Sequence, residues 1–364
     1  MVLPGGIFMH YDKGLPILDN HCHLCFPQPI EESLIAYESL FSQLGIREAA
    51  LLACPVCSHN ENGYDVTENL KILYLKDKLS IPVYAYAGFT EHWDDTEKYR
   101  TFAREMLDMG FDGFKSLESH PRNRKVLGKG LDHPSFADFF NELDQRQILM
   151  VCHVGDPRPN WSEATAYDGA KEAGRVYGPE YPGLEQLYAE MESVMDRYPN
   201  IPFVLAHFYF VSDDYDRACA LMERYPNLRF DLTPGGEMYV NFSKDISKWR
   251  EFFLRYRERI ILGSDHYALG FGKYRYNLAR NFLEGKEPME HRGQPVIPMA
   301  LPEEVLQDIY WNNAKALAGE NPKPVDPKKT LAYCCYVQLR LGSQLSEQGR
   351  ENLCVIKEHF KKKA

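Results

Sequence analysis

The chain has 364 residues, of which 44% are apolar and 26% are charged, and its formal net charge is −10. Its 23 Tyr, 20 Phe and 4 Trp provide enough apolar material for a core, which excludes a disordered chain. No apolar run approaches the roughly 18 residues of a membrane-spanning helix, the acidic balance argues against sequence-independent nucleic-acid binding, and the first residues lack a secretory pattern, so we expect a cytoplasmic globular protein.

Eight short apolar runs recur along the chain at a mean spacing of about 35 residues, which is the size of one strand with its crossover helix. They are nearly continuous in apolar residues, as is typical of parallel strands covered on both faces. The runs are Ile17–Leu24, Ala49–Val56, Pro82–Phe89, Phe111–Leu117, Ile148–Val154, Pro202–Phe210, Leu228–Thr233 and Ile260–Tyr267.

Amphipathic helices are predicted between these strands. Apolar residues recur at helical spacing in Tyr99–Asp108, Leu184–Arg197 and Tyr215–Tyr225. A Tyr-Pro-Asn break follows the last two of these segments, at Tyr198 and Tyr225, and indicates that each helix ends just before the next strand.

Eight alternating strand–helix units are compatible with a closed barrel or with an open doubly wound sheet. No G-x-G-x-x-G follows the first strand, so the dinucleotide-binding form of the open sheet lacks its signature. Polar residues cluster at the carboxyl ends of strands throughout the chain, and a closed barrel brings those ends to one mouth. We therefore expect an α/β fold, a (β/α)8 TIM barrel with enlarged βα loops over residues 1–320. Residues 321–364 are expected to form a linker and a C-terminal helical extension, with one helical segment at Leu331–Phe360.

The cysteines include two Cys-x-x-Cys pairs, Cys22/Cys25 and Cys54/Cys57, which invite a zinc-ribbon interpretation. Zinc ribbons place such pairs on knuckles in poorly cored segments, whereas these pairs lie in or directly after apolar strands. We interpret them as reduced thiols that pack as small buried hydrophobes. The same interpretation covers the cysteines near the C-terminus, Cys334, Cys335 and Cys354.

The residues that carry chemistry lie at the ends of the predicted strands. His21 and His23 share one face of the first strand, and Asp19 is expected one step below them on that face. Later strands add a lysine, two histidines and an aspartate, namely Lys115, His153, His207 and Asp265. Singly, each is more typical of a hydrogen-bonded core residue, a helix cap or a solvated loop. Several imidazoles and a carboxylate buried together, however, need a cation or hydrogen bonds to offset the cost of burial. The set therefore predicts a metal site.

This pattern resembles the amidohydrolase superfamily, and within it the amidohydrolase-related (amidohydrolase 2) branch of metal-dependent TIM-barrel hydrolases. The resemblance covers roughly residues 15–320 and includes the helix Glu303–Gly319, which carries Tyr310-Trp311-Asn312-Asn313-Ala314. The order H-x-H, H, H, D is specific for the superfamily and poorly specific for a reaction.

The resemblance implies that the metal ligands are His21, His23, His153 and Asp265. His207 is implied to be either a further ligand or an acid–base group. A lysine at the position of Lys115 is carboxylated and bridges two metals in binuclear members, and it need not be modified in mononuclear ones, so one or two ions are expected. Asp19 is expected to orient the imidazoles of the H-x-H pair. Zn²⁺ is the expected ion, with Mn²⁺ as an alternative.

A divalent ion with an open position lowers the pKa of bound water toward about 7. Asp265 is expected to accept a proton from that water, and His207 to stabilise developing charge or protonate a leaving group. We expect a hydrolase of an amide, lactone or ester bond, with a non-oxidative decarboxylase or hydratase as the alternative. A TatD-type nuclease shares the H-x-H, but the acidic balance and Lys115 speak against it. The complete ligand set speaks against a binding protein without activity.

The loops after the strands predict the substrate, because they surround the mouth of a barrel. The longest runs from Asp156 to about Gly183 and is expected to form a lid or pocket wall. Its arginines and aromatic residues, and those of neighbouring loops, favour an anionic or aromatic small molecule as the partner. A homo-oligomer is also compatible with the sequence. The candidate lining residues are His120, Arg122, Arg124, Lys125, Arg158, Trp161, Tyr167, Arg175, Tyr177, Glu237, His266, Lys273, Tyr274 and Arg275.

Overall fold

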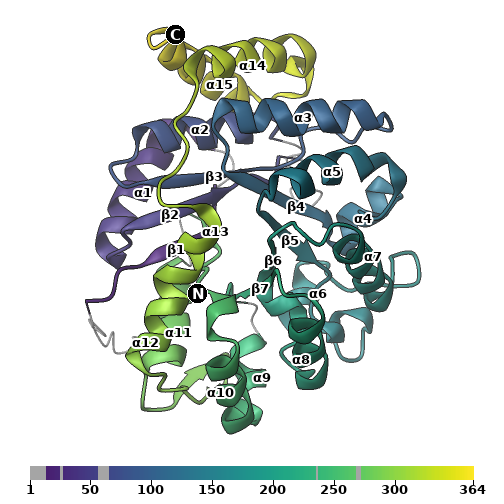
Figure 1. Cartoon of the computed structure of the whole chain (residues 1–364), viewed down its shortest axis with the longest axis vertical. Helices are drawn as coiled ribbons and strands as arrows, with labels where there is room; N and C mark the ends of the chain where they lie inside the picture. The colour runs from purple at the N-terminus through teal and green to yellow at the C-terminus, as the bar shows by residue number, and fades with distance from the viewer. Residues whose placement is uncertain (1–13, 25–27, 56–64, 235–236, 268–271) are drawn as a thin grey trace.

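The computed structural model describes residues 14–24, 28–55, 65–234, 237–267 and 272–364. Parallel strands form a nearly closed barrel with helices between them, so the predicted (β/α)8 architecture is confirmed (Figure 1). The strands of the barrel are β1 Leu18–His23, β2 Glu48–Leu52, β3 Val83–Ala87, β4 Gly113–Ser119, β5 Met150–Val154, β6 Phe203–Leu205, β7 Leu228–Asp231, β8 Ile260–Ile261 and β9 His266–Tyr267.

The barrel closes through the last predicted run, which the structure divides into two short strands. β8 pairs with β7, and β9 pairs with β1. Between them the Asn20 N–H donates to the Leu262 carbonyl at 3.1 Å, and the Asp265 N–H donates to the His21 carbonyl at 2.9 Å. The first and eighth units of the chain are therefore neighbours, which an open sheet would have kept apart.

The helices follow the strands in alternation, and the three that the sequence predicted in detail are observed with small shifts at their ends. The α-helices are α1 Ile30–Leu44, α2 Glu68–Lys78, α3 Thr96–Met109, α4 Pro121–Leu127, α5 Ala137–Arg146, α6 Asp168–Glu172, α7 Leu184–Arg197, α8 Tyr215–Arg224, α9 Met238–Lys244, α10 Ile246–Arg255, α11 Gly272–Glu284, α12 Glu303–Gln307, α13 Asn313–Ala318, α14 Pro327–Arg340 and α15 Glu347–Lys361. Short 3₁₀ segments are η1 Pro134–Phe136, η2 Arg158–Trp161, η3 Ala206–Phe210, η4 Arg257–Arg259 and η6 Gly342–Gln344. The segment η5 Asp308–Asn312 is a π-helical turn. Outside the barrel, β10 Met289–His291 pairs with β11 Gln294–Val296. Among the described helices, none combines the length and the apolar character needed to cross a membrane.

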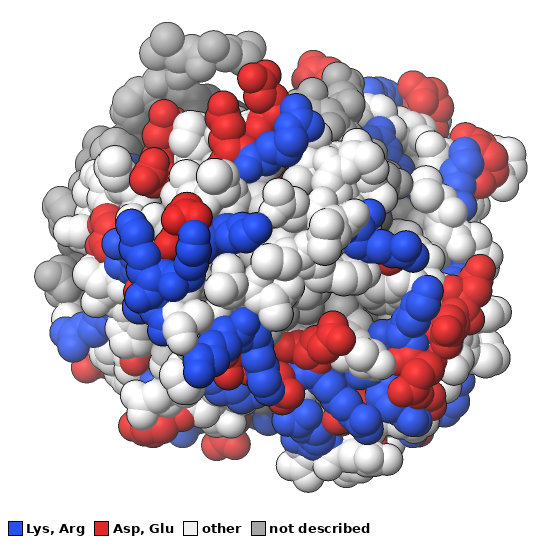
Figure 2. All heavy atoms as spheres, turned by 90° about the horizontal axis from the view of Figure 1, so that it is seen from above, with Lys and Arg blue, Asp and Glu red and all other residues white. Residues whose placement is uncertain are grey.

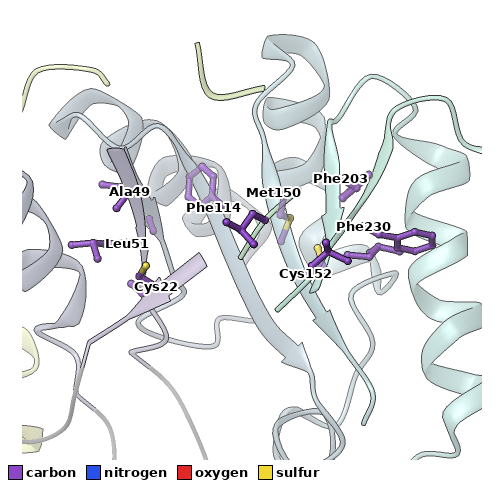
Figure 3. Packing of buried hydrophobic residues seen from close by; sticks show 14 of the residues in the cluster. Cys22, Ala49, Leu51, Phe114, Met150, Cys152, Phe203 and Phe230 are labelled. Atoms are coloured by element: carbon purple, nitrogen blue, oxygen red, sulfur yellow. The ribbon is translucent and has the colours of Figure 1, made fainter. Parts of the chain in front are cut away.

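Side chains of the strands divide into two apolar layers because neighbouring residues point to opposite faces. The outer layer packs against the helices and includes Leu51, Met150 and Phe230 (Figure 3). The inner layer fills the barrel with residues such as Tyr86 and Val151, and the α13 residue Ala314 packs against it. Helix α13 therefore contributes to the core inside the barrel.

A register irregularity in β1 between Asp19 and Cys22 changes which residues face the barrel interior. Leu18 belongs to the inner layer whereas Cys22 belongs to the outer one, although four residues apart they would share a face on a regular strand. The expectation that Asp19 lies on the same face as the two histidines is therefore wrong. A bulge of this kind leaves no signature in the sequence.

The C-terminal extension is present as helices, but the single segment predicted over Leu331–Phe360 is wrong, because α14 and α15 are separated by a turn around η6. Figure 1 shows this pair lying over α2 and α3. On the face seen in Figure 2, basic and acidic side chains are interspersed. The segment before α14 is fixed to the barrel by the Asp326 N–H, which donates to the Met109 carbonyl at 3.0 Å.

The cysteines behave in part as predicted. Cys22, Cys152 and Cys334 are free and buried, and Cys54 and Cys335 are half-buried. Cys354 is exposed on α15, so its expected burial is wrong. Cys25 and Cys57 lie outside the described residues.

Candidate metal centre

The two histidines of β1 turn one ring nitrogen each toward the other. Nδ1 of His21 lies 2.7 Å from Oδ2 of Asp231, and Nδ1 of His23 lies 2.9 Å from the Leu52 carbonyl. Both partners are acceptors, so each Nδ1 carries the hydrogen and each Nε2 of the neutral rings is an unprotonated nitrogen. These two Nε2 atoms lie only 3.0 Å apart. Two unprotonated nitrogens at this distance repel unless a cation or a donor lies beside them, and Nζ of Lys115, 3.2 Å from Nε2 of His21, is such a donor.

A second pair of imidazoles repeats this arrangement. Nδ1 of His207 lies 3.2 Å from the Thr233 carbonyl, and Nε2 of His153 lies 3.0 Å from the Gly155 carbonyl. The remaining nitrogens, Nε2 of His207 and Nδ1 of His153, again carry lone pairs and lie 3.1 Å apart. The rings of His21 and His207 have their centroids 6.0 Å apart, so both pairs belong to one site.

The site combines neutral imidazoles with one carboxylate and one amine. Burial lowers the pKa of His23 to about 3 and that of His207 to about 4. Oδ1 of Asp265 lies 3.6 Å from Nε2 of His23, and Nζ of Lys115 lies 3.2 Å from Nε2 of His21. Although burial acts to raise the pKa of Asp265, Arg275 and the nearby imidazoles lower it overall. The structure thus brings together all six residues singled out at the strand ends.

This donor set fits a divalent metal ion. The ligand atoms of His21, His23 and Asp265 all lie within 4.8 Å of one another. Unprotonated imidazole nitrogens with a carboxylate suit Zn²⁺ and other first-row transition metals.

Asp231, at the end of β7, is a further candidate for a functional residue that the sequence pattern did not single out. Its Oδ2 accepts from Nδ1 of His21, and its Oδ1 accepts from the His207 N–H at 2.8 Å and the Thr233 N–H at 3.2 Å. Burial acts to raise the pKa of Asp231, but the charge and hydrogen bond of His21, the charge of His207 and the hydrogen bond from the Thr233 side chain lower it to about 2. One carboxylate therefore fixes both a ring tautomer and the backbone of a second ligand. The sequence signal that could have identified Asp231 is its position at the carboxyl end of the seventh strand, because the other candidate ligands also lie at the carboxyl ends of strands.

Asp19 does not orient the imidazoles as expected. Its carboxylate accepts from the His21 N–H at 3.2 Å, from the Ser264 N–H at 3.0 Å and from the Ser264 hydroxyl. It therefore joins the backbone of β1 to the segment between β8 and β9 and stabilises the closure of the barrel.

His207 lies on a left-handed turn rather than on the strand that was predicted over Pro202–Phe210. β6 ends at Leu205, and the next residues have positive φ angles: 56° at His207, 53° at Phe208, 57° at Tyr209 and 54° at Phe210. Left-handed backbone costs non-glycine residues about 1–2 kcal/mol each. The hydrogen bonds from the His207 N–H to Asp231 and Thr233 hold the turn in place. Strain of this kind is typical of functional sites.

A second cluster of metal-ligand types, His120, His153 and Asp156, lies beside the centre. Here, however, the hydrogen bonds are already made. Nδ1 of His120 accepts from the Arg122 N–H at 3.2 Å, so its Nε2 carries the hydrogen and faces Oδ2 of Asp156 at 3.3 Å. The Tyr177 hydroxyl donates to the same oxygen. We interpret these three residues as a clamp that joins the loops after β4 and β5.

The remaining loop residues divide between the centre and the surface. Arg275 binds Oδ2 of Asp265, and Trp161 packs on Tyr177 with ring centroids 4.9 Å apart. Arg158 pairs with the exposed Glu185, and Lys273 binds Gln43 at the surface. His266 is buried and stacks on Tyr276. Several of the expected lining residues are therefore solvated or structural side chains.

Comparison with known proteins places this geometry in a family. The family model described as amidohydrolase matches residues 76–319. A search of curated protein sequences gives no match.

Three solved structures illustrate the similarity of the fold. A 4-oxalomesaconate hydratase from Rhodopseudomonas palustris has a TM-score of 0.54 at 12% identity, over 90% of this chain and 99% of that one. A 2,6-dihydroxybenzoate decarboxylase complexed with 2,6-dihydroxybenzoate has a TM-score of 0.52 at 15% identity, over 84% and 98% of the two chains. A dihydroxybenzoic acid decarboxylase from Polaromonas, with bound manganese and the inhibitor 2-nitroresorcinol, has a TM-score of 0.51 at 13% identity, over 84% and 97%. At these sequence identities, the similarity shows a shared fold alone.

Proposed function

The chain belongs to the amidohydrolase family, and on that premise we propose that it is a metal-dependent hydrolase of a small anionic or aromatic molecule. The observation that carries this proposal is the convergence of His21, His23 and Asp265, whose ligand atoms all lie within 4.8 Å of one another, beside the ring nitrogens of His153 and His207, which lie 3.1 Å apart. Burying this many imidazoles with a carboxylate is costly unless a cation or hydrogen bonds compensate.

The ion would be held by His21, His23, His153 and Asp265, with His207 beside it as a further ligand or as an acid–base group. We propose Zn²⁺, because imidazole and carboxylate donors suit it. When bound, such an ion supplies Lewis acidity and lowers the pKa of water.

The side chains around the ion supply the proton chemistry. The unprotonated Nε2 of His207 is able to accept a proton and return it to a leaving group. Lys115 presents a buried amine 3.2 Å from Nε2 of His21, where it stabilises developing negative charge. Arg275 binds Oδ2 of Asp265, and this contact leaves Oδ1 directed toward His23.

A decarboxylase or hydratase is the second candidate, because proteins with those names share the fold. Hydrolysis releases an acid and decarboxylation releases carbon dioxide, so one panel of candidate substrates distinguishes the two reactions. Purified protein is incubated with lactones, esters and amides of small carboxylic acids and with aromatic acids, and acid release and carbon dioxide release are measured. Acid release supports the hydrolase, and carbon dioxide release from aromatic acids replaces it with the decarboxylase.

Metal analysis of the purified protein tests the site itself. Asp265→Asn removes a ligand carboxylate and is expected to lower both metal content and turnover. The matched control is Asp216→Asn on α8, where the side chain is 94% exposed. Unchanged metal content and activity in Asp265→Asn would contradict the site.

A further inference from the structure

Glu237 is a buried acid at the mouth of the barrel for which the proposed chemistry has no use. It follows β7 and directly precedes α9, and its side chain is only 8% exposed. Its Oε1 is buried without a hydrogen-bond partner in the described part of the chain. Leaving such an acceptor unpaired is costly, so its retention calls for an explanation.

The surroundings of Glu237 come from the loops that rim the proposed metal centre. Its carboxyl is close enough to Asp156, Asp213 and Arg292 for their charges to act on it. Asp156 in turn lies 3.9 Å from Nε2 of the ligand candidate His153. Glu237 also follows the carboxyl end of β7 and so lies at the same end of the barrel as the candidate metal centre.

The neighbouring polar groups are already paired. Oδ2 of Asp156 accepts from the Tyr177 hydroxyl and faces His120 at 3.3 Å. Asn241, one turn further along α9, donates to the Ser212 hydroxyl at 3.1 Å and accepts from Lys244 at 2.8 Å. Glu237 thus differs from the buried polar groups beside it in having an acceptor left over.

The charge around Glu237 indicates what that acceptor would bind. Burial, with Asp156 and Asp213, raises the pKa of Glu237 to about 7 against the opposite influence of its own backbone N–H and of Arg292. A further anion would meet repulsion from three carboxyls, whereas a hydroxyl or N–H donor would meet a carboxyl oxygen that has no partner among the described residues. Rotation about the last side-chain torsion exchanges the two carboxyl oxygens, so either one is able to face a ligand.

We propose that Glu237 is a specificity-determining residue of the metal centre, and that it accepts a hydrogen bond from a hydroxyl or amino group on a small carboxylic acid substrate. This inference rests on the proposed function for the placing of the substrate, since the carboxylate of that acid would bind at the metal. It extends that function by assigning the substrate a second polar group, a hydroxyl or an amino group, at the end opposite its carboxylate.

Thermal unfolding of the metal-loaded protein without substrate gives the first test. Glu237→Met removes the unpaired acceptor and keeps the bulk, so the melting temperature is expected to rise, by about 2 °C. Asn241→Ala, which deletes paired groups on the same helix, is expected to lower it. An unchanged or lower melting temperature in Glu237→Met would overturn the proposal, because the carboxyl would then be supporting the fold.

Ligand binding to the same proteins gives the second test, with benzoate, 3- and 4-hydroxybenzoate and 3- and 4-aminobenzoate as probes in calorimetry. The wild type is expected to bind a hydroxylated or an aminated acid about tenfold more tightly than benzoate. That preference is lost in Glu237→Met and retained in Glu237→Gln and Asn241→Ala. The two sets of probes separate a hydroxyl donor from an amine donor.

The possible outcomes distinguish a failure of the role proposed for Glu237 from a failure of the proposed function. An equal preference in the wild type and in Glu237→Met, or no binding of any probe by protein that holds its metal, overturns the role of Glu237 and leaves the metal centre standing. Absence of metal from the wild-type protein overturns the proposed function, and with it the inference.

Discussion

At the scale of single residues, the candidate centre depends on a carboxylate outside the proposed ligand set. Asp231 accepts at both oxygens, from the His21 ring on one side and from the backbone of His207 and Thr233 on the other. Because an amide has only one acceptor, Asp231→Asn turns an N–H₂ group toward one of these donors. We expect metal affinity to fall by about 10–100-fold, as is usual when a group that orients a ligand is changed.

Competition with a chelator measures this change. Asp214→Asn provides the control, since Asp214 caps α8 through the Arg217 N–H at 3.0 Å and asparagine caps equally well. Equal metal affinity in Asp231→Asn and the wild type would show that the tautomer of His21 needs no carboxylate.

Glu68 predicts a pH dependence of stability. It is buried at the start of α2, where its Oε2 accepts from the Cys54 N–H at 3.0 Å. Burial, with Asp65, raises the pKa of Glu68 from 4.5 to about 8. A raised pKa in the folded state means that the folded protein binds the proton more tightly than the unfolded chain. The contribution of Glu68 to the free energy of unfolding is therefore complete below pH 4.5 and is lost as the pH rises to about 8.

Glu68→Gln is expected to remove this dependence, because glutamine keeps the acceptor and does not ionise. Relative to the variant, the unfolding free energy of the wild type should fall by up to about 1.4 kcal/mol per pH unit in that window. Denaturant unfolding at several pH values between 4.5 and 8 measures the difference. Parallel profiles for the two proteins would contradict the assignment.

At the scale of elements, the helices of the extension are anchored to the barrel by both apolar and polar contacts. Asn352 on α15 accepts from the Ile30 N–H at 2.9 Å and donates to the Gln28 carbonyl at 3.0 Å. His359 lies 2.7 Å from Asp77 on α2. Helix α15 is thus fixed to the start of α1 and to α2, while α14 packs on α2 and α3.

Ile356 is fully buried on α15, so Ile356→Ala is expected to leave a cavity and to lower the unfolding free energy by about 2–5 kcal/mol. Leu339→Ala on α14 is the control, because this side chain is 87% exposed and its loss should change stability by no more than about 0.5 kcal/mol. Denaturant unfolding compares the two, and metal content should stay unchanged in both. A similar stability of the two variants would mean that α15 contributes little to the fold.

At the scale of the whole molecule, the proposed ion would join parts of the chain that are distant in sequence. His21 and His23 lie on β1, His153 on β5 and Asp265 directly before β9. A ligand that binds only the folded state stabilises it. Removing metal with a chelator is therefore expected to lower the melting temperature of the wild type, and to have little effect on His23→Ala. An identical response of the two proteins would contradict a resident ion at this site.

The sequence by itself determined the barrel and the choice of candidate residues. Apolar runs about 35 residues apart reflect burial on both faces, which is a local property of each strand. Lys115, His153, His207 and Asp265 were found because parallel strands present their ends at one mouth. The division at about residue 320 and the roles of the site residues stay predictions.

Only the tertiary structure decided the features that depend on partners far apart in the chain. The role of Asp231 follows from contacts across 210 residues to His21, and the bulge in β1 follows from its pairing with β2. The left-handed turn at His207 is unfavourable locally and exists because Asp231 and Thr233 hold it. Local patterns record which side chains are buried, whereas ring tautomers, bulges and strained turns are set by what those side chains meet after folding.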